Sequence, residues 1–190
     1  MKLYLASTSP RRLTILKHLN LKFTPLKPSI TEPEITNTTH PERLATTIAL
    51  LKALSCTRYV KNGLLIGMDT IVVINNQVLG KPGNRSRARK MLKLLSGKTH
   101  QVITAIALIK LPECKIFTSA EKTLVTFRTL SRDEIEAYIQ TPEPYDKAGA
   151  YAIQGKAGLF VSKINGCYLN VIGLPLPRLL NLLKKAGWKK

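Results

Sequence analysis

The sequence contains no long apolar run and only three cysteines among its 190 residues. Charged residues interrupt each apolar stretch before it reaches the about 20 residues that a transmembrane helix needs, so we expect no membrane partner. The N-terminus also lacks the apolar stretch of a signal peptide. Cys56, Cys114 and Cys167 lie far apart without the spacing of metal ligands, which favours reduced thiols and a cytoplasmic location.

Two nucleotide-binding motifs and the usual signs of an RNA-binding module are also missing. The sequence has no Gly-x-x-x-x-Gly-Lys-Ser/Thr, which excludes a P-loop, and no Gly-x-Gly-x-x-Gly after a predicted strand, which leaves a dinucleotide-binding fold unsupported. Aromatic residues make up only 6% of the chain and form no stacking motif, which argues against nucleic acid as the partner.

Acidic residues are scarce, with 11 Asp and Glu against 30 Lys and Arg, and the formal net charge is +19. Such a surface attracts polyanions such as nucleotides, nucleic acids or acidic lipids. A general bias toward Lys and Arg across a proteome explains the same charge equally well. The basic residues are spread along the whole chain, and the two lysine pairs at the C-terminus are too few to form a nucleic-acid-binding arm.

Apolar spacing predicts an α/β fold with a mixed sheet, because helical and hairpin connections both occur between the predicted strands. We expect helices over residues 9–20, 41–59, 84–95 and 131–140, and a closing helix that contains Leu179, Leu180 and Leu183. Asn84 is the expected cap of the third helix, and Ser131 and Glu134 form the expected capping box of the fourth. The predicted strands are 3–5, two pieces within 64–74 before a turn at Asn75-Asn76, a central strand 100–111, then 122–130, 159–164 and, after a turn at Asn165-Gly166, 167–173. With 44% hydrophobic residues and no linker or repeat, residues 1–190 are expected to form one domain with two lobes.

The N-terminal segment LASTSPRR places two arginines in the first turn of a predicted helix. Ser9 is a favourable N-cap and Pro10 suits the first helical position. The positive end of a helix disfavours cations, so Arg11 and Arg12 are an anomaly unless an anion binds there. Unpaired N–H groups, the helix dipole and two guanidinium groups together predict a phosphate site.

The segment GMDTIVV contains an acidic residue within an otherwise apolar stretch. An ionised carboxylate at Asp69 needs a partner, a metal ion or access to water. Two interpretations are open: a turn aspartate between two strand pieces, or a general base or metal ligand at a strand end, where the ligand clefts of α/β proteins tend to lie.

Two lysines and one glycine-rich loop are further candidates. In LGKP, Gly80 permits close approach of a ligand and Lys81 could reach a phosphate, although Gly-Lys-Pro is also an ordinary turn. Lys52 is either a solvated side chain near the apolar face of its helix or a residue at the edge of a cleft. The segment DKAGAYAIQGKAG, residues 146–158, is either a mobile surface loop or a loop that packs against a ligand.

The order of these motifs resembles the Maf family, named for septum-formation inhibition. The matching segments are LASTSPRR, GMDTIVV, LGKP, LSGKTHQVITA, EPYDKAGAYAIQG and INGCYLNVIGLPL. The resemblance as a whole runs from about Leu3 to Leu183, nearly the entire chain. The resemblance implies a two-lobed α/β structure with a deep central cleft, similar to inosine triphosphatases, and a homodimer. It also implies a nucleoside triphosphate pyrophosphatase that uses Mg²⁺ or Mn²⁺. The sequence Ala-Tyr-Ala-Ile-Gln-Gly resembles the branch that acts on dTTP and UTP, and the alternative is the branch associated with 7-methyl-GTP.

The same resemblance implies roles for individual residues. The expected catalytic residues are Asp69, Lys52 and Lys81, with Asp69 as the general base. The expected substrate-binding residues are Ser7, Arg11, Arg12, Thr70 and Gln154, among which Arg11, Thr70 and Gln154 occupy positions tied to base selection. The expected metal ligands are Asp69 and Glu32.

Three positions depart from the family pattern. Met68 stands where a small alanine is usual, Cys167 stands where serine is usual, and the residue before Lys52 is not charged. None of these departures removes a catalytic residue type, but Met68 beside Asp69 could narrow the pocket and alter rate or selectivity. Two other functions stay open on the residues alone: a non-catalytic protein that binds nucleic acid through its positive charge, and a regulator of cell division, the role that the family name records.

Overall fold

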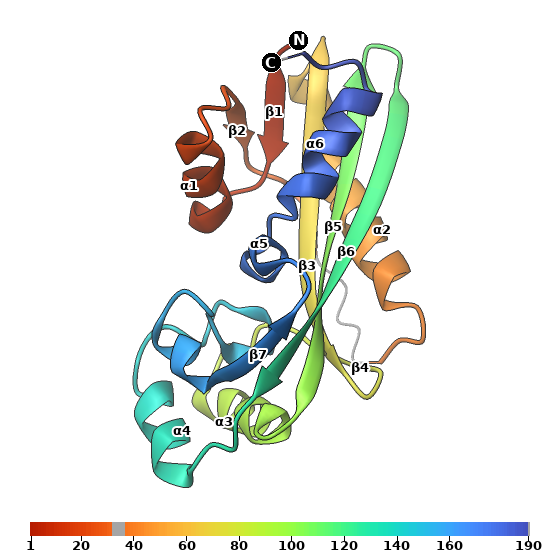
Figure 1. Ribbon diagram of the computed structural model, residues 1–190. Helices are drawn as coiled ribbons and strands as arrows, with labels where there is room; N and C mark the ends of the chain where they lie inside the picture. Colours follow the sequence, from red (N-terminus) through yellow and green to blue (C-terminus); the bar gives the residue numbers. More distant parts are fainter. Residues whose placement is uncertain (32–36, 190) are drawn as a thin grey trace.

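The computed structural model describes residues 1–31 and 37–189 (Figure 1). The strands are β1 (Leu3–Ala6), β2 (Thr24–Leu26), β3 (Gly63–Ile74), β4 (Gln77–Leu79), β5 (Thr99–Leu111), β6 (Lys115–Phe127) and β7 (Val161–Asn165). The helices are α1 (Pro10–His18), α2 (Pro41–Leu54), α3 (Arg85–Leu95), α4 (Arg132–Ile139), α5 (Tyr168–Ile172) and α6 (Leu176–Lys185), and short 3₁₀ turns cover Thr57–Tyr59, Ala148–Ala150 and Lys156–Phe160. Within the described ranges, no helix has the length and apolar character needed to cross a membrane.

Among the described residues, the strands form one seven-stranded sheet in the order β2-β1-β3-β5-β6-β7, with β4 paired to β3. β1 is parallel to β2 and β3, whereas the other pairs are antiparallel. The long strands β3, β5 and β6 run from the end of the molecule that carries α1 and α6 to the end that carries α3 and α4 (Figure 1). A mixed sheet flanked by helices confirms the predicted fold class.

The outer edge of β3 has an opening in its middle. β1 pairs with residues 64–67 of this strand and β4 with residues 72–74, both on the edge opposite β5. No described strand pairs with residues 68–71 on that edge. Asp69 and Thr70 therefore lie where the sheet opens between two partners of β3.

Alternation along β3 sends neighbouring side chains to opposite faces of the sheet. Ile66 and Met68 pack with the leucines of α6 on one face, and Ile71 packs beneath α2 on the other. Asp69 has the parity of Ile71 and lies on the α2 face, whereas Thr70 lies on the opposite face. The opening thus gives one cleft access to side chains from both faces of the sheet.

Small residues allow α2 to lie very close to β3. The helix buries Ala45, Ala49 and Ala53. Opposite them is Gly67, where an added Cβ atom would lie only 2.2 Å from the carbonyl oxygen of Ala49 and 2.8 Å from the backbone nitrogen of Ala53. This approach is possible only without a side chain at Gly67, and it holds the turn that contains Lys52 close to β3.

Several local predictions are confirmed by the structure. Asn75 and Asn76 form the turn between β3 and β4, and both have positive φ angles, of 50° and 63°. The side chain of Asn84 caps α3, and Ser131 begins α4 with the reciprocal hydrogen bonds of a capping box. These signals are read correctly because each depends on contacts within a few residues.

Four predicted elements are wrong in extent or type. The strand expected over 122–130 is β6, which begins at Lys115 and ends at Phe127. Residues 64–74 belong to one continuous strand and not to two pieces, because β5 pairs with β3 from Gly63 to Val73. The helix expected over 41–59 ends at Leu54 and is followed by a 3₁₀ turn. Residues 167–173, expected as a strand, contain α5 instead, and this short helix turns the buried Asn170 toward β5, where it makes several hydrogen bonds.

Substitution Gly67→Ala is expected to lower the free energy of unfolding by about 1–3 kcal/mol, because the new methyl group forces α2 away from β3. Denaturant-induced unfolding measures the change. Gly80→Ala is the matched control, since nothing lies within 4 Å of a Cβ atom there, and it should change stability far less. Equal stability of the two variants would show that the close contact of α2 with β3 does not constrain the fold.

Candidate active site

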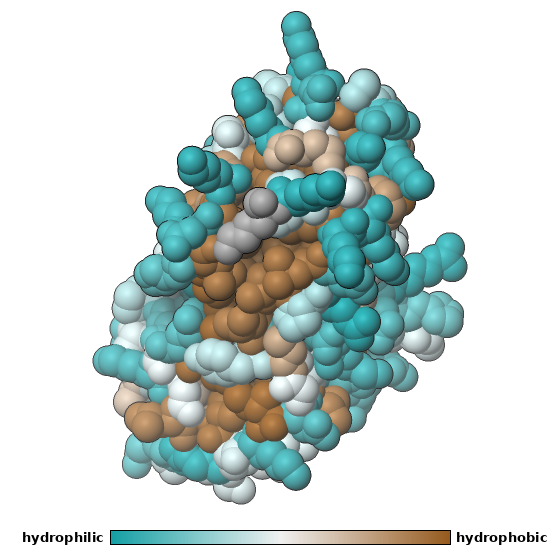
Figure 2. Space-filling model, turned by 45° about the horizontal axis from the view of Figure 1, so that its top comes forward, coloured by the Kyte–Doolittle hydropathy of each residue, from teal (hydrophilic) through white to brown (hydrophobic). Residues whose placement is uncertain are grey.

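A cleft of about 1030 Å³ opens at the unpaired edge of β3. It brings together all the predicted site residues that lie in the described part of the chain, namely Ser7, Arg11, Arg12, Lys52, Asp69, Thr70, Lys81 and Gln154. Glu32, the other predicted metal ligand, lies outside the described residues. Figure 2 shows a hollowed face on which apolar side chains form a floor and hydrophilic side chains stand around it.

An ion pair lies in this cleft between a helix and the sheet. The Nζ atom of Lys52 is 2.6 Å from Oδ1 of Asp69, and the two side chains are only 12% and 9% exposed. The pair answers the question that the sequence raised about an acidic residue in an apolar strand, because Lys52 supplies the charge partner that a buried carboxylate needs. Asp69 is not a turn residue, since it lies within β3.

The two arginines at the start of α1 take different positions. Arg12 is buried, and its guanidinium group donates to the carbonyl oxygens of Gly173 at 2.7 Å and Met68 at 3.2 Å. It also donates to the hydroxyl groups of Ser7 at 3.3 Å and Thr70 at 2.9 Å. These bonds join α1 to β3 and to the segment after α5, so Arg12 organises the wall of the cleft.

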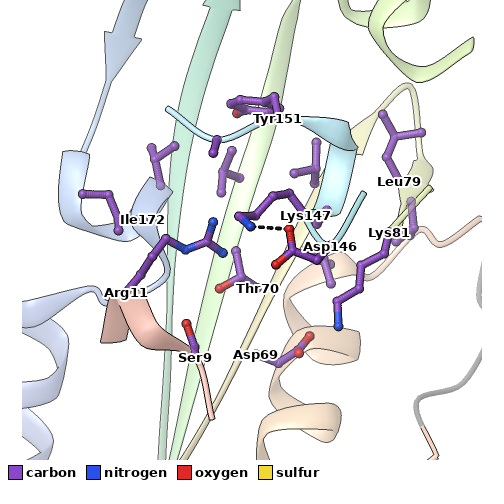
Figure 3. Close-up of a pocket in the computed structure, with 18 of the residues that line it drawn as sticks. Ser9, Arg11, Asp69, Thr70, Leu79, Lys81, Asp146, Lys147, Tyr151 and Ile172 are labelled. Carbon is purple, nitrogen blue, oxygen red and sulfur yellow. Dashed lines mark hydrogen bonds and ion pairs between the residues drawn. The ribbon is translucent and has the colours of Figure 1, made fainter. Parts of the chain in front are cut away.

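Arg11 extends from the first turn of α1 into the cleft, toward Thr70 and the loop that carries Asp146 and Lys147 (Figure 3). Burial lowers the pKa of the Arg11 guanidinium, and the negative charge of Asp146 opposes that change. Ser9 occupies the predicted N-cap position of α1, but its side chain makes no capping hydrogen bond.

Lys81 reaches the cleft from the loop after β4, on the side of Asp69 away from Arg11 (Figure 3). The neighbouring loop is held against it by a hydrogen bond from the backbone N–H of Gly149 to the carbonyl oxygen of Gly80, at 3.2 Å. Gly149 has a φ angle of +71°, and an added Cβ atom would lie 3.0 Å from the side chain of Val72. Only glycine therefore fits this close approach of the loop to β3.

The loop contributes one more pair of charges to the site. Asp146 accepts a hydrogen bond from the ammonium group of Lys147, and the two side chains lie at the centre of the cleft (Figure 3). Burial raises the pKa of Asp146, but Lys147, a backbone hydrogen bond and the charge of Arg11 together outweigh burial, so the pKa lies below its ordinary value. The sequence left this segment open between a mobile surface loop and a ligand-facing loop, and it assigned no role to either residue.

Two parts of the cleft were not anticipated from the sequence. Helix α3 contributes Arg87, Lys90, Met91 and Leu94. These residues recur every three or four positions and share one face of the helix, so their spacing in the sequence could have identified this face as part of the cleft. The ring of Tyr151 forms another part of the wall. Its hydroxyl group lies 2.8 Å from Nε2 of the buried His100, on β5, with which its ring also makes an edge-on contact.

Comparison with known proteins identifies the family. The model described as Maf-like protein matches residues 2–186, so this chain belongs to the Maf family. A dTTP/UTP pyrophosphatase of Carboxydothermus hydrogenoformans is 44% identical, over 99% of this chain and 100% of the relative. One of the same name from Clostridioides difficile is 46% identical, over 97% of this chain and 95% of the relative. Among solved structures, the Staphylococcus aureus Ham1 protein shares the fold, with a TM-score of 0.54 and 14% identity over 98% of this chain and 100% of that one.

His100 is expected to make stability fall in mild acid. Burial lowers its pKa from 6.5 to about 4, so the unfolded chain binds a proton at this residue at a higher pH than the folded chain does. Stability is therefore lost as the pH falls from 6.5 toward 4, by an amount on the order of 3 kcal/mol. His100→Gln should flatten the dependence of melting temperature on pH in that range.

The exposed His18 offers the matched control for this measurement. His18→Gln should keep the pH dependence of the parent protein, because its ring is not buried in the core. The interpretation fails if His100→Gln and His18→Gln lose stability in parallel as the pH is lowered.

Proposed function

We propose that this chain hydrolyses dTTP and UTP to the nucleoside monophosphate and pyrophosphate. The observation that carries the proposal is the 2.6 Å pair of Asp69 and Lys52 in one cleft with Arg11 and Lys81. A carboxylate among several cations suits a triphosphate substrate, whose charge the cations can neutralise. The relatives named dTTP/UTP pyrophosphatase, at 44% and 46% identity, supply the substrate class.

In the proposed reaction a water molecule attacks the α-phosphorus atom in line with the bond to the leaving pyrophosphate. The new bond joins the water oxygen to phosphorus, and the bond from phosphorus to the bridging oxygen breaks. Asp69 orients the water and accepts its proton. Lys52, in contact with Asp69, holds this carboxylate in a fixed direction before attack.

The cations of the cleft have separate tasks in this proposal. Negative charge moves toward the leaving pyrophosphate during the reaction, and Arg11 and Lys81 reach the cleft from opposite sides of Asp69 (Figure 3). We assign them to the phosphate groups, together with Lys52. Arg12 and Ser7 stay predicted substrate-binding residues. They also support the wall of the cleft, because the guanidinium group of Arg12 donates to Ser7 and to two backbone carbonyls.

The residues present suit a divalent cation such as Mg²⁺ or Mn²⁺. Within the described ranges, no group of three acidic, His or Cys side chains could hold a metal ion by itself. Mg²⁺, however, commonly binds one or two carboxylates and completes its coordination with substrate phosphates and water. Asp69 can serve as that carboxylate, and Glu32 stays a predicted second ligand. A bound cation would supply neutralisation of the phosphate charge.

The compartment and the assembly belong to the proposal as well. All three cysteines are free thiols, which is in keeping with a cytoplasmic location. The homodimer implied by the family resemblance stays a prediction, and sedimentation analysis of the purified chain tests it.

Asp69→Asn should lower kcat/KM for UTP at least about 100-fold, because the amide cannot accept a proton from water. Pyrophosphate release in the presence of Mg²⁺ measures the rate, and a chelator should abolish it in the parent protein. Asp133→Asn, an exposed change on α4, is the matched control and should keep the parent rate. Tight, salt-sensitive binding of duplex DNA without any turnover of nucleotides would instead favour a nucleic-acid-binding protein.

Gln154→Glu should shift selectivity away from pyrimidines. An amide offers one acceptor and one donor, which matches the N3–H and carbonyl groups of uracil and thymine, whereas a carboxylate only accepts and suits the paired N–H donors of a guanine. The ratio of kcat/KM for 7-methyl-GTP to that for UTP should rise in this variant. Gln140→Glu makes the same change of charge at the exposed end of α4. Gln140→Glu should leave the ratio of kcat/KM for 7-methyl-GTP to that for UTP unchanged. If this ratio changes equally in Gln154→Glu and Gln140→Glu, or in neither, Gln154 has no role in base choice.

A further inference from the structure

The hydroxyl group of Thr70 is directed by a chain of hydrogen bonds that begins outside the cleft. Thr70 lines the cleft at the unpaired edge of β3, close to Arg11 (Figure 3). Its Oγ1 atom lies 2.9 Å from the guanidinium of Arg12 and 2.9 Å from Oγ1 of Thr104, the residue opposite it on β5. Thr104 lies 3.0 Å from the carbonyl oxygen of Asn170.

The chemistry of these groups fixes the direction of every bond in the chain. A carbonyl oxygen can only accept, so the single hydroxyl proton of Thr104 goes to Asn170. Thr104 must then accept from Thr70, which uses the only hydroxyl proton that Thr70 has. A guanidinium group can only donate, so Arg12 occupies one lone pair of the Thr70 oxygen. One lone pair remains on Thr70, and this hydroxyl can only accept from a ligand.

The far end of the chain is held rigidly. Thr104 and Asn170 are both 0% exposed. The side-chain oxygen of Asn170 accepts from the backbone N–H of Thr104 at 3.1 Å, and its amide nitrogen donates to Val102 at 3.0 Å and to Thr123 at 2.9 Å. These hydrogen bonds attach α5 to two strands. The carbonyl oxygen that accepts the hydrogen bond from Thr104 is therefore held in place, and moving it would break several buried hydrogen bonds.

We propose that Thr104 is a positioning residue for substrate selection, which makes Thr70 a pure hydrogen-bond acceptor toward the cleft. Such an acceptor favours a base edge that presents an N–H donor. Uracil and thymine have this donor at N3, whereas cytosine has a lone pair there that would face the lone pair of Thr70. This inference rests on the proposed function, because it identifies the ligand with a pyrimidine nucleoside triphosphate.

Replacement of Thr104 by valine tests the proposal, since valine keeps the shape and removes the acceptor. The proton of Thr70 is then free to point into the cleft and to bond N3 of cytosine. The ratio of kcat/KM for UTP to that for CTP should fall roughly tenfold or more in Thr104→Val, because the buried acceptor no longer dictates the proton. The change should come from a lower KM for CTP, while kcat for UTP stays within about threefold of the parent.

Two variants separate this effect from general loss of structure. Thr104→Ser retains the hydroxyl group and should restore the parent ratio. Thr123→Val removes another fully buried hydroxyl from the same network, one that bonds Asn170 and Cys167 but not Thr70. This variant should lower the melting temperature and leave the ratio of kcat/KM for UTP to that for CTP unchanged.

The outcomes distinguish this inference from the proposed function. If the parent protein hydrolyses neither UTP nor dTTP, the proposed function is wrong and the inference fails with it. If the parent hydrolyses UTP but Thr104→Val has the same ratio of kcat/KM for UTP to that for CTP as the parent, only the inference is overturned. The same conclusion follows if Thr123→Val lowers this ratio as much as Thr104→Val does. Should Thr104→Val not fold, Thr70→Val replaces it as the test: loss of the acceptor must reduce kcat/KM for UTP more than for CTP, and an equal reduction overturns the proposal.

Discussion

The whole site depends on an interruption in the pairing of one strand. β3 has β5 along one edge, but on the other edge its pairing with β1 ends at Gly67 and its pairing with β4 starts at Val72. The intervening residues can expose Asp69 and Thr70 to a cleft without losing the support of the sheet, because β5 continues to pair with them. A flexible loop could present the same side chains, but it would not hold them at fixed positions.

Elements on both faces of the sheet converge on this opening. On one face, the absence of a side chain at Gly67 lets α2 approach until Lys52 meets Asp69. On the other, Arg12 ties α1 to β3, and the buried hydroxyl of Thr104 connects Thr70 to α5. In the proposed reaction the charged groups bind the phosphates and orient the water, and in the proposed selection of the base the neutral network directs the hydroxyl proton of Thr70.

The sequence predicted the fold class, and the predicted site residues that the structure describes line one cleft. It did not predict the geometry within that cleft. The caps at Asn84 and Ser131 and the turn at Asn75-Asn76 were predictable because they depend on near neighbours. The strand expected at 167–173 was wrong. The residues around Asn170 favour a strand locally, but the buried hydrogen bonds of Asn170 with β5 and β6 stabilise a short helix there instead. Arg11 and Arg12 point in different directions because adjacent residues of a helix are about 100° apart around its axis. Which of the two is buried depends on a hydrogen bond from Arg12 to Gly173, 161 residues away in the sequence. The contact of Lys52 with Asp69 likewise depends on packing at Gly67, which no local pattern records.

The central claim is that the cleft at this opening holds a triphosphate with its α-phosphorus atom facing Asp69. A crystal structure with Mg²⁺ and a UTP analogue that cannot be cleaved between the α- and β-phosphates tests it most directly. We expect phosphate oxygens in contact with Lys52, Lys81 and Arg11, and a water molecule between Asp69 and the α-phosphorus atom. Phosphates bound elsewhere on the basic surface, or a triphosphate reversed so that Asp69 faces the base, would contradict it.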